Sequence, residues 1–175
     1  MLLPSLSRSA FLLDHSSFLD RFDSHEIVSN PENLQFFFPA TQTQYETDCL
    51  LVHYFMKEPL GCFGAIVDRE SNKLIGIVRF EKIDVQKRTA ELGYFLNALY
   101  WGRGIMTETV TCLSDLALTA MGMERIILIA HLENKASIRV AEKSGFKLVS
   151  RFKGADRYTR TMRDYLRFEK EENCE

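Results

Sequence analysis

The spacing of hydrophobic and polar positions changes several times along this chain, and each change predicts a new element. Apolar residues recur at intervals of three and four, the spacing of an amphipathic helix, in residues 16–29, 41–57 and 105–120. Short runs rich in β-branched and aromatic residues, bounded by polar turns, predict antiparallel strands at residues 62–67, 74–80 and 89–96. The pattern therefore indicates helices combined with a sheet.

The last third of the chain continues this alternation without a linker or an internal repeat. Residues 126–130 predict a buried strand, residues 134–144 a short helix, and residues 147–152 and 163–168 a closing hairpin. Together with the earlier elements, these segments predict an α/β fold, with a mixed and mostly antiparallel central sheet and helices on both faces. With no boundary in the pattern, we expect one domain over residues 1–175.

Two helix ends are marked by particular residues. Thr41 or Thr43 is a suitable N-cap for the second helix, and Glu46 follows closely. A threonine hydroxyl at this place accepts a hydrogen bond from a backbone N–H that has no partner inside the helix. Gly122 predicts the end of the third helix, because glycine adopts the left-handed conformation that often follows a last turn.

Length, composition and charge restrict the class of protein. A chain of 175 residues with 46% apolar content is large enough to bury about two-thirds of its unfolded surface in one core. The net charge of −2 argues against direct nucleic-acid binding, which usually requires a basic domain. Basic residues gather over 151–170, which predicts either a solvated hairpin or a surface for phosphates or an acidic partner.

The cysteines and the apolar runs indicate a compartment. The four cysteines, at 49, 62, 112 and 174, form no close pair, so we expect neither a zinc site nor a disulfide framework and predict no metal. Pro4 and Arg8 interrupt the apolar run at the start of the chain, and no later run approaches the length of a membrane span. We therefore expect a cytoplasmic protein that has no membrane contact.

Residues 100–108, Tyr-Trp-Gly-Arg-Gly-Ile-Met-Thr-Glu, lie between a predicted strand and a predicted helix. Gly102 and Gly104 permit unusual φ angles and close approach of another molecule to the backbone. The first amides of the following helix have no acceptor inside the helix and favour an anion. This layout predicts phosphate binding, with an ordinary tight turn as the alternative.

Glu91 is the leading candidate for a catalytic base. Strand alternation puts Ala90 and Leu92 on one face and Glu91 on the other. A carboxylate on a central strand requires solvent or hydrogen bonds, which suggests a wet cleft. The alternatives are a structural ion pair with Arg79 or Lys82, a base at His131, or a water molecule that serves as the base.

The helix predicted over 134–144 carries polar residues at its start and a glycine at its end. Asn134 is a good N-cap, and Ser137 at the third helical position is acceptable in a first turn. Gly145 followed by Phe146 predicts a left-handed residue after the helix and an apolar residue that packs back on it. These positions explain the residues without any function.

Three segments in order, namely the strand Glu91-Leu92-Gly93-Tyr94, the loop from Trp101 to Glu108 and the helix over 134–144 that ends in Gly145-Phe146, resemble the GNAT acetyltransferases. The resemblance covers roughly residues 60 to 170 and is closest to the ribosomal-protein N-acetyltransferase branch. It implies the GNAT fold and direct transfer of an acetyl group from acetyl-CoA to an amine. The implied acceptor is the α-amino group of a protein, such as a ribosomal protein.

The resemblance also implies roles for individual residues. The backbone of Arg103, Gly104, Ile105, Met106 and Thr107 would bind the coenzyme pyrophosphate. Asn134 would contact the pantetheine arm or the substrate, and Phe146 would pack beside the coenzyme. Ser137 stands where this branch places a hydroxyl near the thioester sulfur.

Three residues depart from the family pattern. Trp101 stands where Gln or Arg is usual, Met106 where Gly or Ala is usual, and Ala141 where most members have the tyrosine that protonates the leaving thiolate. Ser137 therefore becomes the candidate acid, with water as its rival. The alternatives to protein acetylation are acetylation of a small amine, such as a polyamine or an antibiotic, and a catalytically idle module that binds coenzyme A. The sequence leaves monomer and homodimer open.

Overall fold

The computed structural model describes residues 11–14, 21–36, 39–54, 63–156 and 159–172. The chain forms two compact units, one of residues 1–79 and 94–105 and the other of residues 80–93 and 106–175. We call these unit 1 and unit 2. The hydrogen-bonded strand order is β1-β2-β3-β4-β5-β7-β6. Strands β3 (Lys73–Asp84) and β4 (Thr89–Leu96) contribute to both units.

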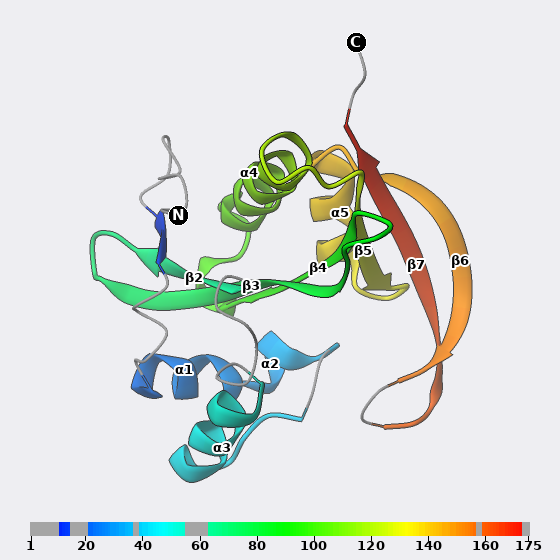
Figure 1. Ribbon diagram of the computed structural model, residues 1–175. Helices are drawn as coiled ribbons and strands as arrows, with labels where there is room; N and C mark the ends of the chain where they lie inside the picture. Colours follow the sequence, from blue (N-terminus) through cyan, green and yellow to red (C-terminus); the bar gives the residue numbers. More distant parts are fainter. Residues whose placement is uncertain (1–10, 15–20, 37–38, 55–62, 157–158, 173–175) are drawn as a thin grey trace. The chain divides into compact units, whose positions relative to one another are not determined.

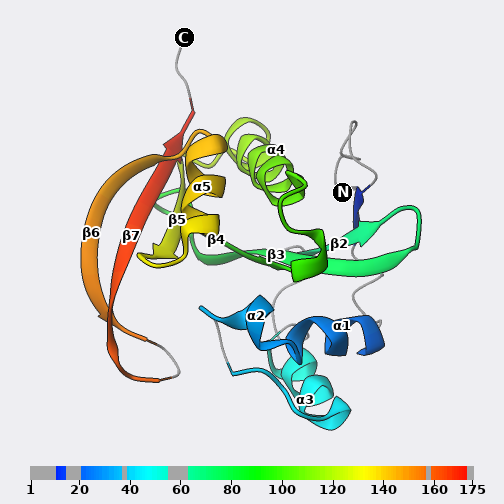
Figure 2. The ribbon, with the colours of Figure 1, turned by 180° about the vertical axis from the view of Figure 1, so that it is seen from behind.

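Unit 1 combines antiparallel strands with three α-helices and a short 3-10 helix in its described residues. Its strands are β1 (Phe11–Asp14), β2 (Phe63–Asp68), the first part of β3 and the end of β4; its helices are α1 (Arg21–Val28), α2 (Pro31–Leu34), α3 (Gln44–Tyr54) and the short 3-10 helix η2 (Ala98–Tyr100). Strand β2 pairs antiparallel with β1 and with β3. Helices α1, α2 and α3 lie together on one face of the β2–β3 pair (Figures 1 and 2).

Unit 2 contains the last part of the sheet and two further helices. Its elements after β4 are α4 (Ile105–Thr119), β5 (Arg125–His131), α5 (Lys135–Lys143), β6 (Lys147–Ala155) and β7 (Met162–Glu171). Strand β5 is parallel to β4 and antiparallel to β7, which also pairs antiparallel with β6. The β6–β7 pair forms a long curved hairpin, drawn in orange and red in Figure 1. The predicted mixed, mostly antiparallel sheet is confirmed.

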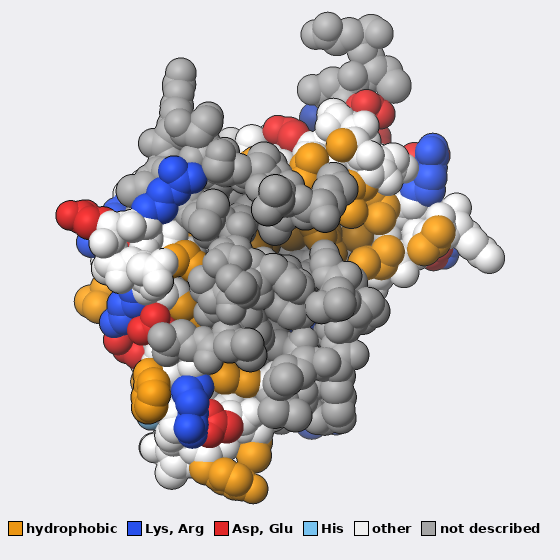
Figure 3. All heavy atoms as spheres, turned by 60° about the vertical axis from the view of Figure 1, so that its left-hand side comes forward, with side chains coloured by type: hydrophobic (Ala, Val, Ile, Leu, Met, Phe, Trp, Pro, Cys, Tyr) orange, Lys and Arg blue, Asp and Glu red, His pale blue; other side chains and the backbone are white. Residues whose placement is uncertain are grey.

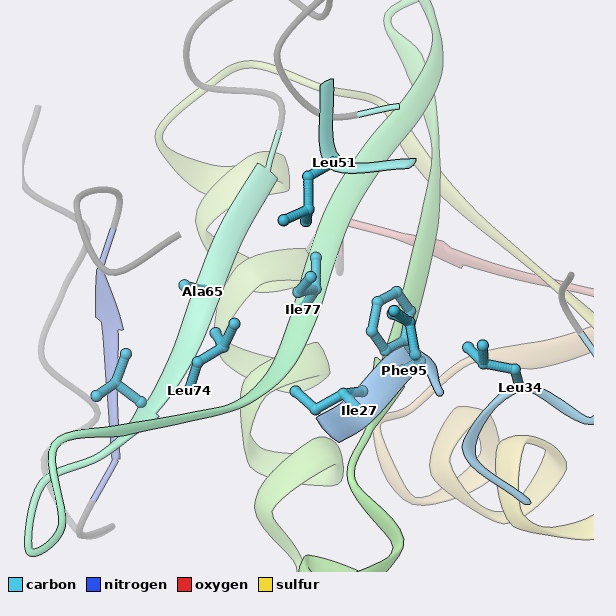
Figure 4. Close-up of a cluster of buried hydrophobic side chains, with 9 residues drawn as sticks. Ile27, Leu34, Leu51, Ala65, Leu74, Ile77 and Phe95 are labelled. Atoms are coloured by element: carbon cyan, nitrogen blue, oxygen red, sulfur yellow. The ribbon is translucent and has the colours of Figure 1, made fainter. Parts of the chain in front are cut away.

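The core of unit 1 lies between the helices and the sheet. Its buried side chains come from α1, α2, α3, β2, β3 and the end of β4 (Figure 4), and they are Ile27, Val28, Leu34, Leu51, Ala65, Val67, Leu74, Ile77 and Phe95. Burying a side chain of this size stabilises the folded state by about 1.5–3 kcal/mol. Phe95 belongs to this core, so the last residues of β4 are anchored by the helices of unit 1.

The predicted elements differ from the observed ones mainly in the first third of the chain. Helix α1 begins at Arg21, and residues 16–20 of the predicted helix lie outside the described residues. Strand β1 and helix α2 have four residues each and were not predicted. Elements this short carry too few residues for a periodic pattern.

The cap of α3 is Thr43, one of the two predicted candidates. The Thr43 hydroxyl accepts a hydrogen bond from the Glu46 N–H at 3.2 Å, and the Glu46 carboxylate accepts one from the Thr43 N–H at 3.2 Å. This reciprocal pair satisfies two backbone donors at the start of the helix. Thr41 instead makes a buried hydrogen bond with the hydroxyl of Thr47 at 2.8 Å.

Strand β5 differs in one respect from the prediction of a buried strand. Ile126, Leu128 and Ala130 are buried, whereas Ile127 and Ile129 are only partly buried. The alternation means that one face of β5 packs in the core and the other is partly open. The sequence does not reveal this difference, because isoleucine occurs on both faces of the strand.

Gly76 in β3 is required by close packing in unit 1. A Cβ atom at this position would lie 2.8 Å from the Phe95 carbonyl oxygen and 2.9 Å from Leu96 Cδ1. We therefore expect Gly76→Ala to destabilise the protein by about 1–3 kcal/mol, because the backbone oxygen cannot move aside cheaply. Urea unfolding of the two proteins measures this difference, and an unchanged midpoint would contradict the packing argument.

The basic segment 151–170 forms part of the hairpin and is partly neutralised within it. Arg151 pairs with Asp164 at 3.3 Å, and Arg167 with Glu169 at 2.7 Å. Lys170 pairs with Asp115 of α4 at 2.6 Å. Figure 3 shows another face of the molecule, where several Lys or Arg side chains lie next to Asp or Glu side chains. In the part of the chain that is described, no helix is both long and apolar enough to cross a membrane.

Candidate functional site

The loop before α4 has the backbone geometry that the glycines predicted. Gly102 and Gly104 have φ angles of +74° and +79°, a region that residues with a Cβ rarely adopt. A Cβ built on Gly104 would meet no atom within 4 Å. This glycine therefore faces open space next to the first amides of α4. Backbone N–H groups at such a place can approach and bind an anion.

Trp101 has a structural role in this loop. Its indole N–H donates a hydrogen bond to the Leu96 carbonyl at 2.8 Å, although the side chain remains 43% exposed. The guanidinium of Arg103 donates to the Leu99 carbonyl at 3.0 Å and lies 4.9 Å from the ring centre of Tyr100. These contacts close the turn on itself.

The start of α5 in unit 2 brings Asn134 and Ser137 together. The Asn134 side chain accepts a hydrogen bond from the Ser137 N–H at 3.0 Å. Asn134 is therefore the N-cap and Ser137 the third helical residue, as predicted. Both residues are partly buried and belong to the N-terminal end of the helix, where negative charge is favoured.

The end of α5 is closed by the predicted glycine cap. Gly145 has a φ of +84°, its N–H donates to the Glu142 carbonyl at 3.2 Å, and the Phe146 N–H donates to the Ala141 carbonyl at 3.0 Å. Ala141 is fully buried. The position where the family resemblance implies a tyrosine therefore holds a fully buried methyl group.

Two contacts join α5 to other elements of unit 2. The hydroxyl of Ser144, a buried residue, donates a hydrogen bond to the Thr107 carbonyl at 3.2 Å. The ring of Phe146 is buried, with the Lys170 ammonium 5.9 Å from its centre. The first turn of α4, which contains Met106 and Thr107, is therefore tied to the end of α5. Met106 is also buried.

Glu91 lies on β4 and pairs with Lys82, one of its two expected partners. The Lys82 ammonium donates to the Glu91 carboxylate at 2.7 Å. The Glu91 side chain is 20% exposed and that of Lys82 is 59% exposed. Ala90 and Leu92 are buried on the opposite face of the strand, as the alternation predicted. The ion pair is thus present, and the carboxylate still reaches solvent.

His131 ends β5 and is held by its neighbours. Its Nδ1 atom accepts a hydrogen bond from the Glu133 N–H at 3.1 Å, so the proton of the neutral ring is on Nε2. The ring meets Tyr165 edge-on, with the centres 5.5 Å apart. This ring nitrogen is already used as an acceptor, as is one oxygen of the Glu91 carboxylate in its pair with Lys82.

Tyr165 is an aromatic neighbour that the sequence analysis did not select. It lies opposite His131 in the β5–β7 register and stacks on Phe152, with ring centres 5.6 Å apart. Burial, followed by the negative charge of Asp156, raises the pKa of Tyr165 above its usual value. Only the strand register reveals this neighbour, because Tyr165 lies 34 positions after His131 in the sequence.

The described pairing of β5 differs in length on its two sides. With β4 it runs from Thr89 opposite Arg125 to Glu91 opposite Ile127. With β7 it runs from Arg125 opposite Glu171 to His131 opposite Tyr165.

Cys49 and Cys112 are free thiols, whereas Cys62 and Cys174 lie outside the described residues. Burial raises the pKa of the Cys112 thiol above its usual value, so this group is a poor nucleophile at neutral pH. Within the described ranges, no three His, Cys, Asp or Glu side chains gather in a way that could hold a metal ion.

Comparison with known proteins identifies the class. Residues 13–147 match the model of the acetyltransferase (GNAT) domain, and the chain belongs to this family. It is 41% identical over 87 residues to the probable N-acetyltransferase YjcK of Bacillus subtilis, a match that covers 49% of this chain and 46% of that protein. It is 29% identical over 87 residues to the ribosomal-protein-serine acetyltransferase of Escherichia coli, which covers 50% and 49%.

The solved structures agree on the fold. The RimL ribosomal L7/L12 α-N-protein acetyltransferase in complex with coenzyme A superimposes with a TM-score of 0.81 and 21% identity, over 100% of both chains. This superposition and the family match confirm the predicted GNAT fold.

By sequence, the chain spans about half the length of the curated relatives it matches.

Proposed function

We propose that this protein is an N-acetyltransferase that transfers an acetyl group directly from acetyl-CoA to an amine. The observation that carries the proposal is the loop at Gly104, where a left-handed glycine faces open space at the start of a 15-residue helix. A GNAT sequence with this loop intact retains the backbone donors for a pyrophosphate. The residues present therefore fit acetyl-CoA.

The coenzyme contacts are assigned to backbone and side chains of known placement. The amides of Arg103, Gly104, Ile105, Met106 and Thr107 bind the pyrophosphate. Asn134, the N-cap of α5, contacts the pantetheine arm or the substrate. Phe146 packs beside the coenzyme, the role that the family resemblance implies for it. Acetyl-CoA supplies an acetyl group activated as a thioester.

Glu91 and Ser137 are assigned the two proton-handling roles. An amine attacks only as the neutral base, so a group must accept its proton, and Glu91 is a solvent-accessible carboxylate on β4. The departing sulfur requires a hydrogen bond or a proton. Ser137 lies in the first turn of α5, and the tyrosine that usually has this role is replaced by the buried Ala141.

The acceptor is assigned to the α-amino group of a protein, with ribosomal proteins as the first class to test. The support is the likeness to the ribosomal-protein-serine acetyltransferase of Escherichia coli over half of each chain. A small amine is the second class. The third reading is an idle module that binds coenzyme A, and the absence of the usual tyrosine favours it.

Gly104→Val tests the coenzyme loop. The new side chain enters the space that the pyrophosphate requires, so we expect acetyl-CoA affinity to fall at least about tenfold, or about 1.4 kcal/mol. Trp101 is the only tryptophan in the chain and lies three residues away, so its fluorescence during a titration with acetyl-CoA measures binding. Calorimetry provides an independent value.

Gly122→Val is the matched control. Gly122 also has a positive φ, +69°, and a Cβ there would also meet nothing within 4 Å, but it follows the other end of α4. The two variants carry similar backbone strain, so only Gly104→Val should lose acetyl-CoA. Equal affinity of a folded Gly104→Val and the parent would remove coenzyme binding from this loop.

A further inference from the structure

Two asparagines in unit 1 hold the segment that leads into the coenzyme loop. Asn33 of α2 is 5% exposed, and Asn97, the residue after β4, is 3% exposed. Burying an amide side chain is unfavourable unless its donor and acceptor groups are hydrogen-bonded. The hydrogen-bond partners of these two side chains therefore identify the segments that they hold together.

Asn33 connects the end of α1 to η2. Its side-chain oxygen accepts a hydrogen bond from the Ala98 N–H at 2.7 Å. Its side-chain nitrogen donates to the Ile27 carbonyl at 2.8 Å. One side chain thus satisfies a backbone donor at the start of η2 and a backbone acceptor in α1.

Asn97 connects η2 to β3 and α1. Its N–H donates to the Ile75 carbonyl at 2.8 Å, and its side-chain oxygen accepts from the Leu99 N–H at 3.1 Å. Its side-chain nitrogen donates to the Glu26 carboxylate at 3.1 Å. Both ends of this side chain are used, so the first turn of η2 has one orientation in unit 1.

The hydrogen bonds continue from η2 into the loop. The Trp101 N–H donates to the Ala98 carbonyl at 3.1 Å, the Trp101 indole to Leu96, and the Arg103 guanidinium to the Leu99 carbonyl. Asn33 and Asn97 fix Ala98 and Leu99. These two residues then supply the carbonyls that hold Trp101 and Arg103, and Gly104 follows directly.

We propose that Asn33 and Asn97 are positioning residues for acetyl-CoA binding, through η2 and the loop to Gly104. The proposal rests on the coenzyme role of this loop proposed above. A glycine-containing loop has many accessible conformations, and acetyl-CoA binds only one of them. The apparent affinity is reduced by the fraction of molecules whose loop is in that conformation. The two asparagines reduce that loss by holding η2, so α1 and α2 contribute to coenzyme affinity without touching the coenzyme.

Asn33→Ala and Asn30→Ala separate positioning from general stability. Asn30 caps α2 through a 3.0 Å hydrogen bond to the Glu32 N–H, so both changes weaken the same helix, but only Asn33→Ala breaks the bond to η2. We expect Asn33→Ala to weaken acetyl-CoA binding about tenfold in calorimetry and Asn30→Ala less than about twofold. The kcat at saturating acetyl-CoA should stay near the parent value in both.

A donor–acceptor exchange at Asn97 supplies a second test. Asn97→Asp retains the acceptor for Leu99 but places a carboxylate against Glu26, so acetyl-CoA binding should weaken. Adding Glu26→Gln restores a donor between the two side chains and should recover most of the affinity, while Glu26→Gln alone controls for the loss of the Lys73 ion pair. This exchange remains informative if Asn33→Ala does not fold.

The outcomes distinguish this proposal from the one on which it rests. If Gly104→Val abolishes binding while folded Asn33→Ala binds like the parent, or if the exchange at Asn97 fails to recover affinity, the asparagines do not position the loop. If Gly104→Val itself binds acetyl-CoA normally, the coenzyme role of the loop fails first, and an effect of Asn33→Ala on affinity would need another cause.

Discussion

Replacing Glu91 with Gln should lower the turnover of acetyl transfer about 10²- to 10⁴-fold at neutral pH, the range expected for loss of a general base. The change removes the charge but retains the size and hydrogen-bonding capacity of the side chain. Acetyl-CoA affinity should not change. Turnover should recover in part at alkaline pH, where the amine loses its proton unaided, and a pH–rate profile with chemistry rate-limiting measures this.

Lys82→Gln is the control for the ion pair. It breaks the 2.7 Å contact and leaves the carboxylate in place. If Glu91 is the base, Lys82→Gln should retain turnover and the shape of the pH–rate profile. If Glu91 serves only the ion pair, the two variants should lose stability to a similar degree, and neither should alter the profile. Parental turnover of Glu91→Gln at neutral pH would move the search to His131 or water.

Ser137→Ala should lower turnover about 10²-fold or more and leave acetyl-CoA affinity nearly intact. A hydrogen bond to the departing sulfur is made mainly in the transition state, so its loss affects kcat and not ground-state binding. The fold should tolerate the change, because alanine is acceptable within the first turn of a helix. Single-turnover measurements with saturating acetyl-CoA isolate this step.

Ser137→Thr and Ala141→Tyr define the role further. Threonine retains the hydroxyl and should preserve much of the turnover. Adding Ala141→Tyr to Ser137→Ala should not restore turnover, because Ala141 is fully buried and a phenol ring at this place would overfill the core. Full turnover of Ser137→Ala would assign the protonation to water or to another group.

The sequence predicted those elements whose signals are local. Apolar residues alternate with polar or small ones over 89–94, and the predicted limits of β4, Thr89–Leu96, agree with the observed ones. The caps of α5 were read from Asn134 and from the Gly145-Phe146 pair, each within a few residues of the helix end. The positive φ of Gly104 followed from two glycines between a strand and a helix. In each case the chemistry that fixes the structure is contained in one short segment.

The sequence could not predict contacts that join distant segments. Asn33 and Ala98 are 65 residues apart, and nothing in either segment indicates the other. Tyr165 became a neighbour of His131 only through the β5–β7 register. The Glu91–Lys82 pair was one of the predicted alternatives, beside a pair with Arg79. The identity of the base is a question of proton transfer, which neither periodicity nor packing decides.

The most direct measurement is acetyl transfer itself. The protein is incubated with acetyl-CoA and, separately, with ribosomal proteins, peptides and small amines, while thiol release and the mass of each acceptor are followed. We predict thiol release that depends on an acceptor, the gain of one acetyl group on an amine of that acceptor, and the loss of both in Gly104→Val. Acetyl-CoA binding without acceptor-dependent thiol release in any of these classes would contradict the assignment and leave a module that only binds coenzyme A.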